Sequence, residues 1–198
     1  MHAVIDDSRL ANLVTQSADG LIATPLPLIL DRSEGPHGTL YGHVARANPQ
    51  WQATTVGEAL VIFMGPDAYV TPSWYATKRE TGKVVPTWNY VAVHAYGLPE
   101  FFTDSDRLLA LVTRLTKRHE GSRAAPWAVS DAPAQYVQSQ LRGIAGFRLP
   151  IARLEGKRKM SQNRSAEDRA GVIDGLAASQ NSSDRVVAEL VQRADRTA

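Results

Sequence analysis

Short runs of apolar residues, separated by turn residues, fill the first two-thirds of the chain. Residues 21–30 are apolar but contain Pro25 and Pro27, which predicts an edge strand or two strand fragments. Residues 39–45 predict a strand whose side chains alternate between two faces, with Leu40 and Val44 on one and Tyr41 and His43 on the other. This period of two is typical of a half-buried strand.

The middle of the chain predicts longer strands. Residues 59–64 form an unbroken apolar run that ends at Gly65, as in a strand buried on both faces. We expect residues 68–71 to return as its hairpin partner. The polar residues 77–83 predict a loop, and residues 84–102 predict the longest β segment.

Helical periodicity comes later. Leucines at 108, 111 and 115 predict a helix over about 104–120, and Asp131-Ala132-Pro133 predicts a second helix over about 132–142. Ser165 with Asp168 resembles a capping box and predicts a helix through about Leu176. Ser182 or Ser183 is predicted to cap a last helix, which carries an apolar stripe.

Many short strands followed by helices predict a mainly β fold with peripheral helices (α+β). A closed or partly closed antiparallel barrel satisfies so many short strands because it removes their exposed edges. We expect residues 1–160 to form the β-barrel core, with the helices at about 104–120 and 132–142 inserted. Residues 161–198 are expected to form a C-terminal helical extension packed on the barrel.

Composition and charge narrow the class of protein. With 43% hydrophobic and 21% charged residues among 198, the chain is typical of a folded globular protein. It contains no cysteine, which excludes disulfides, thiolate nucleophiles and cysteine-ligated metal sites. No apolar run approaches the ~20 residues of a membrane helix, and no secretory signal is visible, so we expect a cytoplasmic protein. The net charge of +2 permits contact with anions without requiring it.

Familiar catalytic and nucleotide motifs are absent. The sequence has no Gly-x-Ser-x-Gly, no Gly-x-Gly-x-x-Gly and no P-loop, and its five histidines show no i, i+4 ligand spacing. We therefore assign no catalytic residue and no metal site.

Three donor-rich stretches remain as candidates for binding. Residues 43–51 place His43, an arginine, amides and a tryptophan at a strand end. Residues 69–75 and 85–90 interleave hydroxyls, amides and large rings, which suits a planar ligand. The cations of residues 153–169 indicate a solvated face, a phosphate clamp or contact with a nucleic-acid backbone.

These stretches also carry a family resemblance. Residues 38–51, 65–75, 82–91, 126–133 and 154–164 resemble, in order, the PaiB family of negative transcriptional regulators, a branch of the FMN-binding split-barrel proteins. Pro25 and Asp67 stand where that family commonly has histidine, and Arg158 stands where it has tryptophan. His43 is therefore the histidine to which a ligand contact is assigned.

The resemblance implies a homodimeric FMN-binding split β-barrel with the flavin at the subunit interface, and possible DNA binding as a repressor. Arg46, Lys159 and Arg164 would be counter-ions for the phosphate, with Thr71, Ser73 and Gln162 as neutral donors. The full set of residues expected to bind the cofactor is His43, Arg46, Asn48, Trp51, Thr71, Ser73, Trp74, Trp88, Asn89, Lys159, Gln162 and Arg164.

Two alternatives stay open on the sequence. One is a flavin-dependent oxidoreductase of the split-barrel class, in which FMN supplies the redox chemistry and the protein orients it. The other is a binding module for haem or a similar planar ligand.

Overall fold

A computed structural model describes residues 1–195. Contacts between Cα atoms divide the chain into two compact units. The first unit consists of Met1–Phe63 and Val93–Glu155, and the second unit of Met64–Ala92 and Gly156–Ala198. The last three positions of the predicted C-terminal extension, 196–198, lie outside the described residues.

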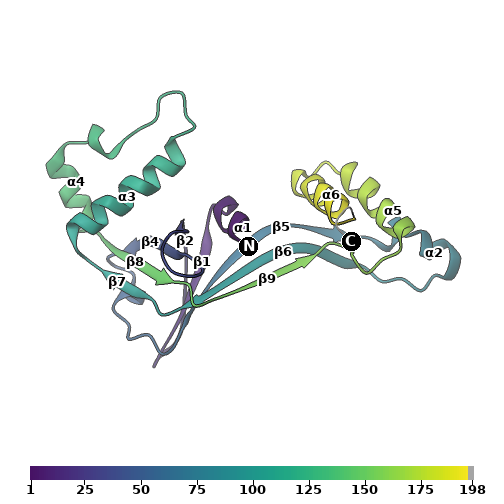
Figure 1. The fold of residues 1–198 in the computed structure, drawn as a ribbon, viewed down its shortest axis with the longest axis horizontal. Helices are drawn as coiled ribbons and strands as arrows, with labels where there is room; N and C mark the ends of the chain where they lie inside the picture. The colour runs from purple at the N-terminus through teal and green to yellow at the C-terminus, as the bar shows by residue number, and fades with distance from the viewer. Residues whose placement is uncertain (196–198) are drawn as a thin grey trace. The chain divides into compact units, whose positions relative to one another are not determined.

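Nine strands form two sheets within the described residues (Figure 1). A five-stranded sheet has the order β2-β1-β5-β6-β9, with bounds Gly20–Leu26, Ala11–Ser17, Ala59–Val70, Thr87–Gly97 and Arg153–Lys159. A four-stranded sheet has the order β3-β4-β8-β7, with bounds Ile29–Asp31, Thr39–Ala45, Ile144–Pro150 and Glu100–Phe102. The β1–β2, β3–β4, β4–β8 and β7–β8 pairs are antiparallel.

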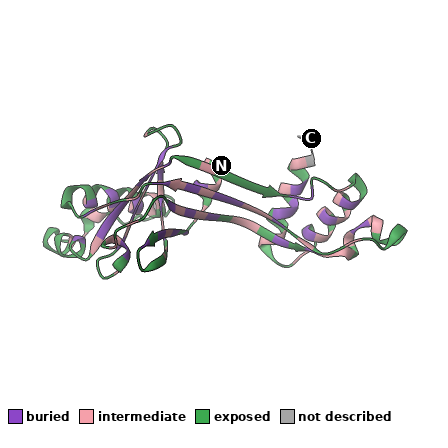
Figure 2. Cartoon of the chain, turned by 90° about the horizontal axis from the view of Figure 1, so that it is seen from below, coloured by how far each residue is buried: buried purple, intermediate pink, exposed green. Residues whose placement is uncertain are grey.

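The core of the first unit draws on both sheets. Alternate residues of β1 and β4 are buried, and Leu13, Leu40, Phe63, Phe147 and Leu149 are almost completely shielded from water. They belong to one apolar cluster, as expected for a barrel whose strands turn one face inward. Figure 2 shows buried positions along several strands and on helices, while loops and the strand β9 (Arg153–Lys159) are mostly exposed.

Helices cover the first unit's four-stranded sheet. The helix α3, Ser105–Glu120, begins where the Asp104 carboxylate accepts a hydrogen bond from the Arg107 amide at 2.9 Å. Its leucines form a second cluster with Phe102 and with Leu141 of α4, Ala134–Leu141. Both helices lie where the sequence predicts them, and α1 (His2–Asp7) and the short η1 (Pro49–Trp51) and η3 (Val129–Asp131) complete the unit.

The second unit has its own apolar cluster. It joins Val70 of β5 and Tyr75 to buried residues of α5 (Ala166–Ala177) and α6 (Ser182–Asp195). Figure 1 shows α5 and α6 side by side against these strands, and the two helices are in extensive contact. The remaining helices are η2 (Pro72–Trp74) and α2 (Ala76–Thr81).

Three local predictions are wrong. Residues 68–71 do not return as a hairpin partner, because β5 continues through Gly65-Pro66 to Val70. A Cβ at Gly65 would lie only 3.1 Å from the Cβ of Val91, so the glycine permits a close strand approach. Residues 77–83 contain the helix α2, which ends at Gly82 with φ +68°. The predicted segment 84–102 is two strands, β6 and β7.

Other elements agree with the sequence or were not anticipated. Residues 21–30 do form two fragments, β2 and β3, each at the edge of its sheet. The strand β1 was missed because Thr15 and Ser17 occupy two of its four buried positions and weaken the apolar alternation. Within residues 1–195, every helix falls short of the length and apolarity that crossing a bilayer requires.

Candidate functional site

His43 lies on β4 in the first unit, opposite Gly146 of β8. Its side chain is half-buried, and its Nδ1 atom is buried without a hydrogen-bond partner. Burial lowers the pKa of His43 below its ordinary value of 6.5, because the cationic form loses hydration. The fold therefore encloses this ring nitrogen without giving it a hydrogen-bond partner among the described residues, and burial disfavours the cationic imidazole.

The polar segment after β4 folds back on itself. The Asn48 carboxamide oxygen accepts from the Gln50 amide at 2.9 Å, and its Nδ2 donates to the Thr24 hydroxyl at 2.9 Å. The Arg46 guanidinium lies 4.3 Å from the centre of the Trp51 ring, while Trp51 Nε1 donates to the Arg46 carbonyl at 2.9 Å. Trp51 thus positions an exposed arginine, and Asn48 fixes the turn that leads to Trp51.

Gln50 is a polar residue of this segment that sequence reasoning did not select. It is completely buried, and its Nε2 lies within hydrogen-bond distance of the Leu13 carbonyl, the Thr15 hydroxyl and the Ile22 carbonyl. Its Oε1 has no partner. Nothing in the local sequence distinguishes a buried glutamine from an exposed one, because the burial depends on β1 and β2.

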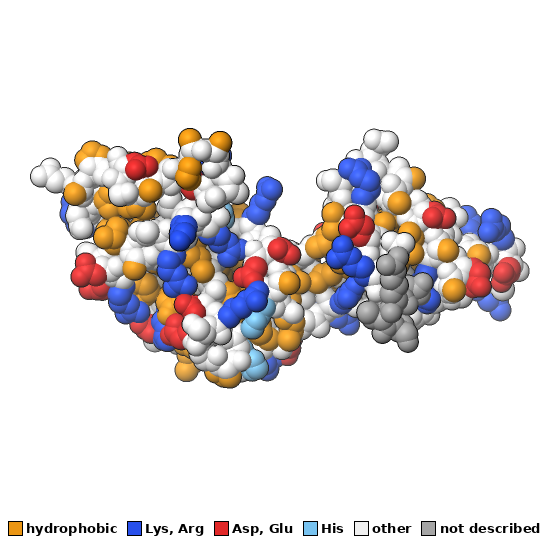
Figure 3. Space-filling view, turned by 45° about the horizontal axis from the view of Figure 1, so that its top comes forward, with side chains coloured by type: hydrophobic (Ala, Val, Ile, Leu, Met, Phe, Trp, Pro, Cys, Tyr) orange, Lys and Arg blue, Asp and Glu red, His pale blue; other side chains and the backbone are white. Residues whose placement is uncertain are grey.

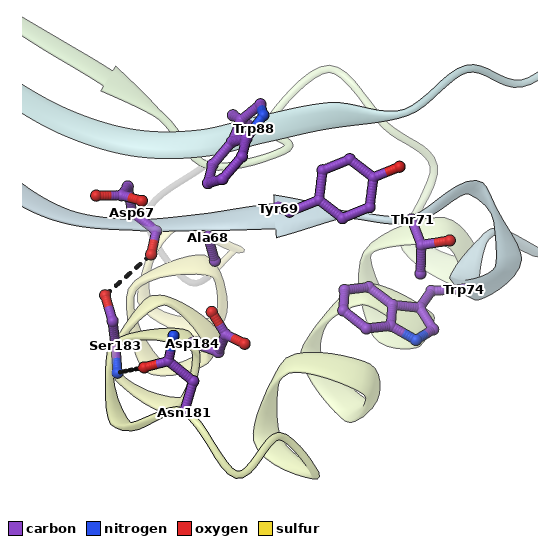
Figure 4. A pocket seen from close by; sticks show the side chains of 9 residues that line it. All are labelled: Asp67, Ala68, Tyr69, Thr71, Trp74, Trp88, Asn181, Ser183 and Asp184. Atoms are coloured by element: carbon purple, nitrogen blue, oxygen red, sulfur yellow. Dashed lines mark hydrogen bonds between the residues drawn. The ribbon is translucent and has the colours of Figure 1, made fainter.

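The second unit contains a cavity of about 640 Å³. Three of the predicted cofactor residues, Thr71, Trp74 and Trp88, lie in its wall (Figure 4). Tyr69 packs edge-on to Trp88, with ring centres 5.8 Å apart. The full lining is Asp67, Ala68, Tyr69, Thr71, Trp74, Trp88, Asn181, Ser183 and Asp184.

Two glycines of α5 hold Trp74 in this wall. A Cβ at Gly171 would lie 2.0 Å from the Trp74 carbonyl oxygen, and one at Gly175 would lie 2.3 Å from its indole ring. The Thr71 hydroxyl accepts from the Ser73 amide at 3.3 Å, and the Ser73 hydroxyl accepts from Lys78 Nζ at 3.1 Å. The turn before α2 is therefore tightly specified.

The remaining predicted residues surround the end of β9. Asn89 and Ser161 are hydrogen-bonded in the interior, and Lys159 Nζ donates to the Thr87 hydroxyl. The side-chain amide of Gln162 closes its own turn, accepting from the Met160 amide and donating to the Arg158 carbonyl. Arg164 lies over Tyr75, 4.5 Å from the ring centre. None of these predicted residues lines the cavity.

The three cations predicted to contact the phosphate are free of carboxylate partners among the described residues. Within the described part of the chain, Arg46, Lys159 and Arg164 form no salt bridge. Other arginines form salt bridges with carboxylates at the surface, where Figure 3 shows basic and acidic side chains intermixed. In residues 1–195, no three His, Asp or Glu side chains gather in a way that could hold a metal ion.

The chemistry of these groups fits a phosphorylated planar cofactor. In the first unit His43 and Arg46 supply polar groups, and in the second unit Lys159 and Arg164 supply positive charge while Trp74 and Trp88 supply flat apolar surface. The cavity itself is lined by two carboxylates and by no Lys or Arg, so it does not suit a phosphate. The predicted residues divide between the first unit (His43, Arg46, Asn48 and Trp51) and the second (the other eight).

A family model described as "Putative FMN-binding domain" matches residues 1–153. The chain belongs to this FMN-binding family. It is also 33% identical to the protease synthase and sporulation protein PAI 2 of Bacillus subtilis, over 95% of this chain and 88% of that one. An uncharacterized protein of Aspergillus fumigatus is 40% identical, over 79% of this chain and 76% of its own. The predicted PaiB resemblance is thereby confirmed, and the FMN predicted as cofactor agrees with the family.

Solved structures share the fold of this FMN-binding family member. The flavocytochrome Anf3 of Azotobacter vinelandii is 16% identical with a TM-score of 0.55, covering 85% of this chain and 71% of that chain. The FAD and haem binding protein of Mycobacterium smegmatis is 17% identical with a TM-score of 0.55, covering 79% and 68% respectively. At these identities the likeness concerns the fold alone, and it confirms the predicted fold class.

Proposed function

We propose that this protein is a cytoplasmic, PaiB-like negative transcriptional regulator that binds FMN as a homodimer, with the flavin at the subunit interface. The observation that carries the FMN site is the set of three cations, Arg46, Lys159 and Arg164, that have no carboxylate partner in the described residues. A phosphate monoester carries close to two negative charges, so uncompensated cations favour its binding.

Each predicted residue has a role in this proposal. Trp51 contacts Arg46 at the surface, Asn48 caps the turn before Trp51, and the buried ring nitrogen of His43 has no partner among the described residues. Trp74 and Trp88 provide aromatic surface in the second unit, while the Asn89–Ser161 pair supports the end of β9. Thr71, Ser73 and Gln162 belong to the turns that border these groups.

The FMN site is tested by flavin binding. We expect the purified full-length chain to bind FMN, measured by equilibrium dialysis and flavin absorbance, with Arg46→Ala and Lys159→Ala each weakening binding by about tenfold. Lys157→Ala and Arg142→Ala are matched controls, since both cations are exposed and neither belongs to the proposed site. Equal losses in the variants and the controls would contradict a specific phosphate site.

Dimerisation requires its own measurement. The proposal expects a mass of twice 21.6 kDa by light scattering, with or without FMN. A monomer that binds FMN at full affinity would overturn the placement of the flavin at a subunit interface.

Repression rests on DNA binding. The strand β9 lies at the edge of its sheet and exposes Lys157 and Arg158, which can contact phosphates. We expect a gel shift with the DNA upstream of the protein's own gene, weakening steeply as salt rises. The Lys157→Ala/Arg158→Ala variant should weaken the shift, and no shift at low salt would rule out the regulator.

A flavin-dependent oxidoreductase is the second candidate, because the cavity in the second unit leaves room for another reactant. Steady consumption of NAD(P)H by the FMN-loaded protein, with an electron acceptor present, would establish this activity. Bound haem, seen as a Soret band in the purified protein, would instead favour the planar-ligand module.

A further inference from the structure

The cavity in the second unit has a second wall outside the family domain. The family match ends at residue 153, whereas Asn181, Ser183 and Asp184 come from the beginning of α6. The Ser183 hydroxyl donates to the Asp67 carbonyl at 2.9 Å and thereby ties α6 to β5 (Figure 4). The family match therefore covers only part of the wall of this cavity.

Aromatic side chains form one part of the cavity. Tyr69 and Trp88 are about half exposed, at 47% and 52%, although both are large rings. They meet edge to face with an interplanar angle of 68°, which offers an incoming group two differently oriented rings. Trp74 is a third ring in the lining of the cavity (Figure 4).

Carboxylates form the other part. In Figure 4 Asp67 is drawn on the opposite side of the cavity from Tyr69 and Trp74, and Asp184 is drawn between Asp67 and Trp74. In the described part of the chain, neither aspartate forms a salt bridge, and no Lys or Arg lines the cavity. The Ser179 hydroxyl donates to the Asp184 carboxylate at 2.6 Å and holds it in place. The cavity thus carries uncompensated negative charge.

The amino terminus of α6 does not make the cavity favourable to anions. The Asn181 carboxamide accepts from the Ser183 amide at 3.0 Å, so a side chain of the protein already caps this helix end. Asp184 in the first turn further offsets the positive end of the helix dipole. An anion would meet two carboxylates here and is disfavoured.

We propose that this cavity binds an organic ammonium ion, held by aromatic rings on one side and by Asp67 and Asp184 on the other. Rings with negative faces attract alkylated ammonium groups, and nearby carboxylates supply the long-range charge. A cavity of about 640 Å³ lies in the size range of small-molecule sites. This function goes beyond FMN binding and does not require it.

The test compares choline with its uncharged isostere, 3,3-dimethylbutan-1-ol. The full chain, free of flavin, is titrated with each compound while the indole N–H signals of its four tryptophans are followed by NMR. We expect choline to shift the signals of Trp74 and Trp88 in a saturable manner, and the isostere to bind at least about tenfold more weakly. Trp51 and Trp127, which do not line the cavity, should not respond.

Variants test which side chains of the cavity bind the ammonium ion. Asp67→Asn/Asp184→Asn should weaken choline binding by about tenfold, and Trp88→Leu should weaken it to a similar extent. Asp174→Asn is the matched control, because Asp174 is an exposed residue of α5 outside the cavity. The asparagine at 184 retains an acceptor for Ser179, which protects the fold.

Three results would overturn the proposal. The isostere could bind as tightly as choline, which would make the cavity merely apolar. Inorganic phosphate could shift the Trp74 and Trp88 signals in place of choline. FMN, whose binding is measured separately by absorbance, could displace choline in proportion to its occupancy, which would make the cavity the flavin's own. Choline binding without FMN binding would contradict only the proposed FMN function, and the reverse result only this inference.

Discussion

Asn89 and Ser161 are hydrogen-bonded to each other in the interior of the second unit, 72 residues apart in the sequence. Asn89 Nδ2 donates to the Ser161 hydroxyl at 3.0 Å, and the hydroxyl lies 3.2 Å from the Asn89 carboxamide oxygen. Both residues are buried, at 0% and 4% exposure. Ser161 also has a left-handed backbone, with φ +57°, so a strained turn and a buried polar pair coincide at the end of β9.

Breaking this pair should destabilise the chain. Asn89→Ala leaves the Ser161 hydroxyl buried without its partner, which costs about 1–3 kcal/mol. The double variant Asn89→Ala/Ser161→Ala should cost less than the sum of the two single variants, because each single change strands the other group. Urea unfolding of all four proteins measures the coupling, and strictly additive losses would show that the pair does not act as a unit.

Removing the Trp74 side chain should restore stability to only one of two glycine variants. Gly171→Ala and Gly175→Ala each force an atom into Trp74, at a cost of about 1–3 kcal/mol. Trp74→Ala should relieve Gly175→Ala, whose obstacle is the indole ring. It should not relieve Gly171→Ala, whose obstacle is the backbone carbonyl. Thermal unfolding distinguishes the cases, and equal rescue of both variants would contradict this packing.

Acid should weaken the first unit through Glu34. Hydrogen bonds from Arg148 and Tyr41 lower the pKa of Glu34 below its ordinary value of 4.5. The folded state therefore favours the carboxylate, and this stabilisation is present above pH 4.5 and is lost as the pH falls below it.

The variant Glu34→Gln isolates this contribution. It should make the stability less dependent on pH below about 4.5, with a difference of about 1 kcal/mol or less, because the pair is partly exposed and screened. Urea unfolding between pH 3 and pH 6 checks the slope. An unchanged slope would mean that the carboxylate gains nothing from Arg148.

His43 should also make the first unit less stable as the pH falls, but at a higher pH than Glu34. Burial lowers its pKa below 6.5, so the unfolded chain binds a proton more readily than the folded one. Stability should therefore decrease as the pH falls through 6.5 toward the lower pKa of the folded state, and His43→Phe should remove this dependence. Histidine titration by NMR measures the pKa directly, with His119→Gln, on an exposed face of α3, as the control for assignment. A titration of His43 above pH 6.5 would contradict its burial.

The sequence predicted the features that depend on local residue patterns. The alternation in residues 39–45 was sufficient for β4, since period-two burial leaves a direct trace in the chain. The leucine repeat and the Asp104 cap were sufficient for α3. The long matches around residues 38–51 and 65–75 also pointed to the FMN-binding family, which residues 1–153 match.

Only the tertiary structure decided the contacts between distant segments. The apolar run ends at Gly65-Pro66, yet β5 continues through these residues to Val70. Gly65 fits there because it has no Cβ to crowd Val91 on the neighbouring strand. The cavity joins Asp67 and Trp88 to Asp184, and no local pattern links these positions. Secondary structure follows from neighbours in the chain, whereas a site of this kind depends on long-range packing, whose partners the sequence does not name.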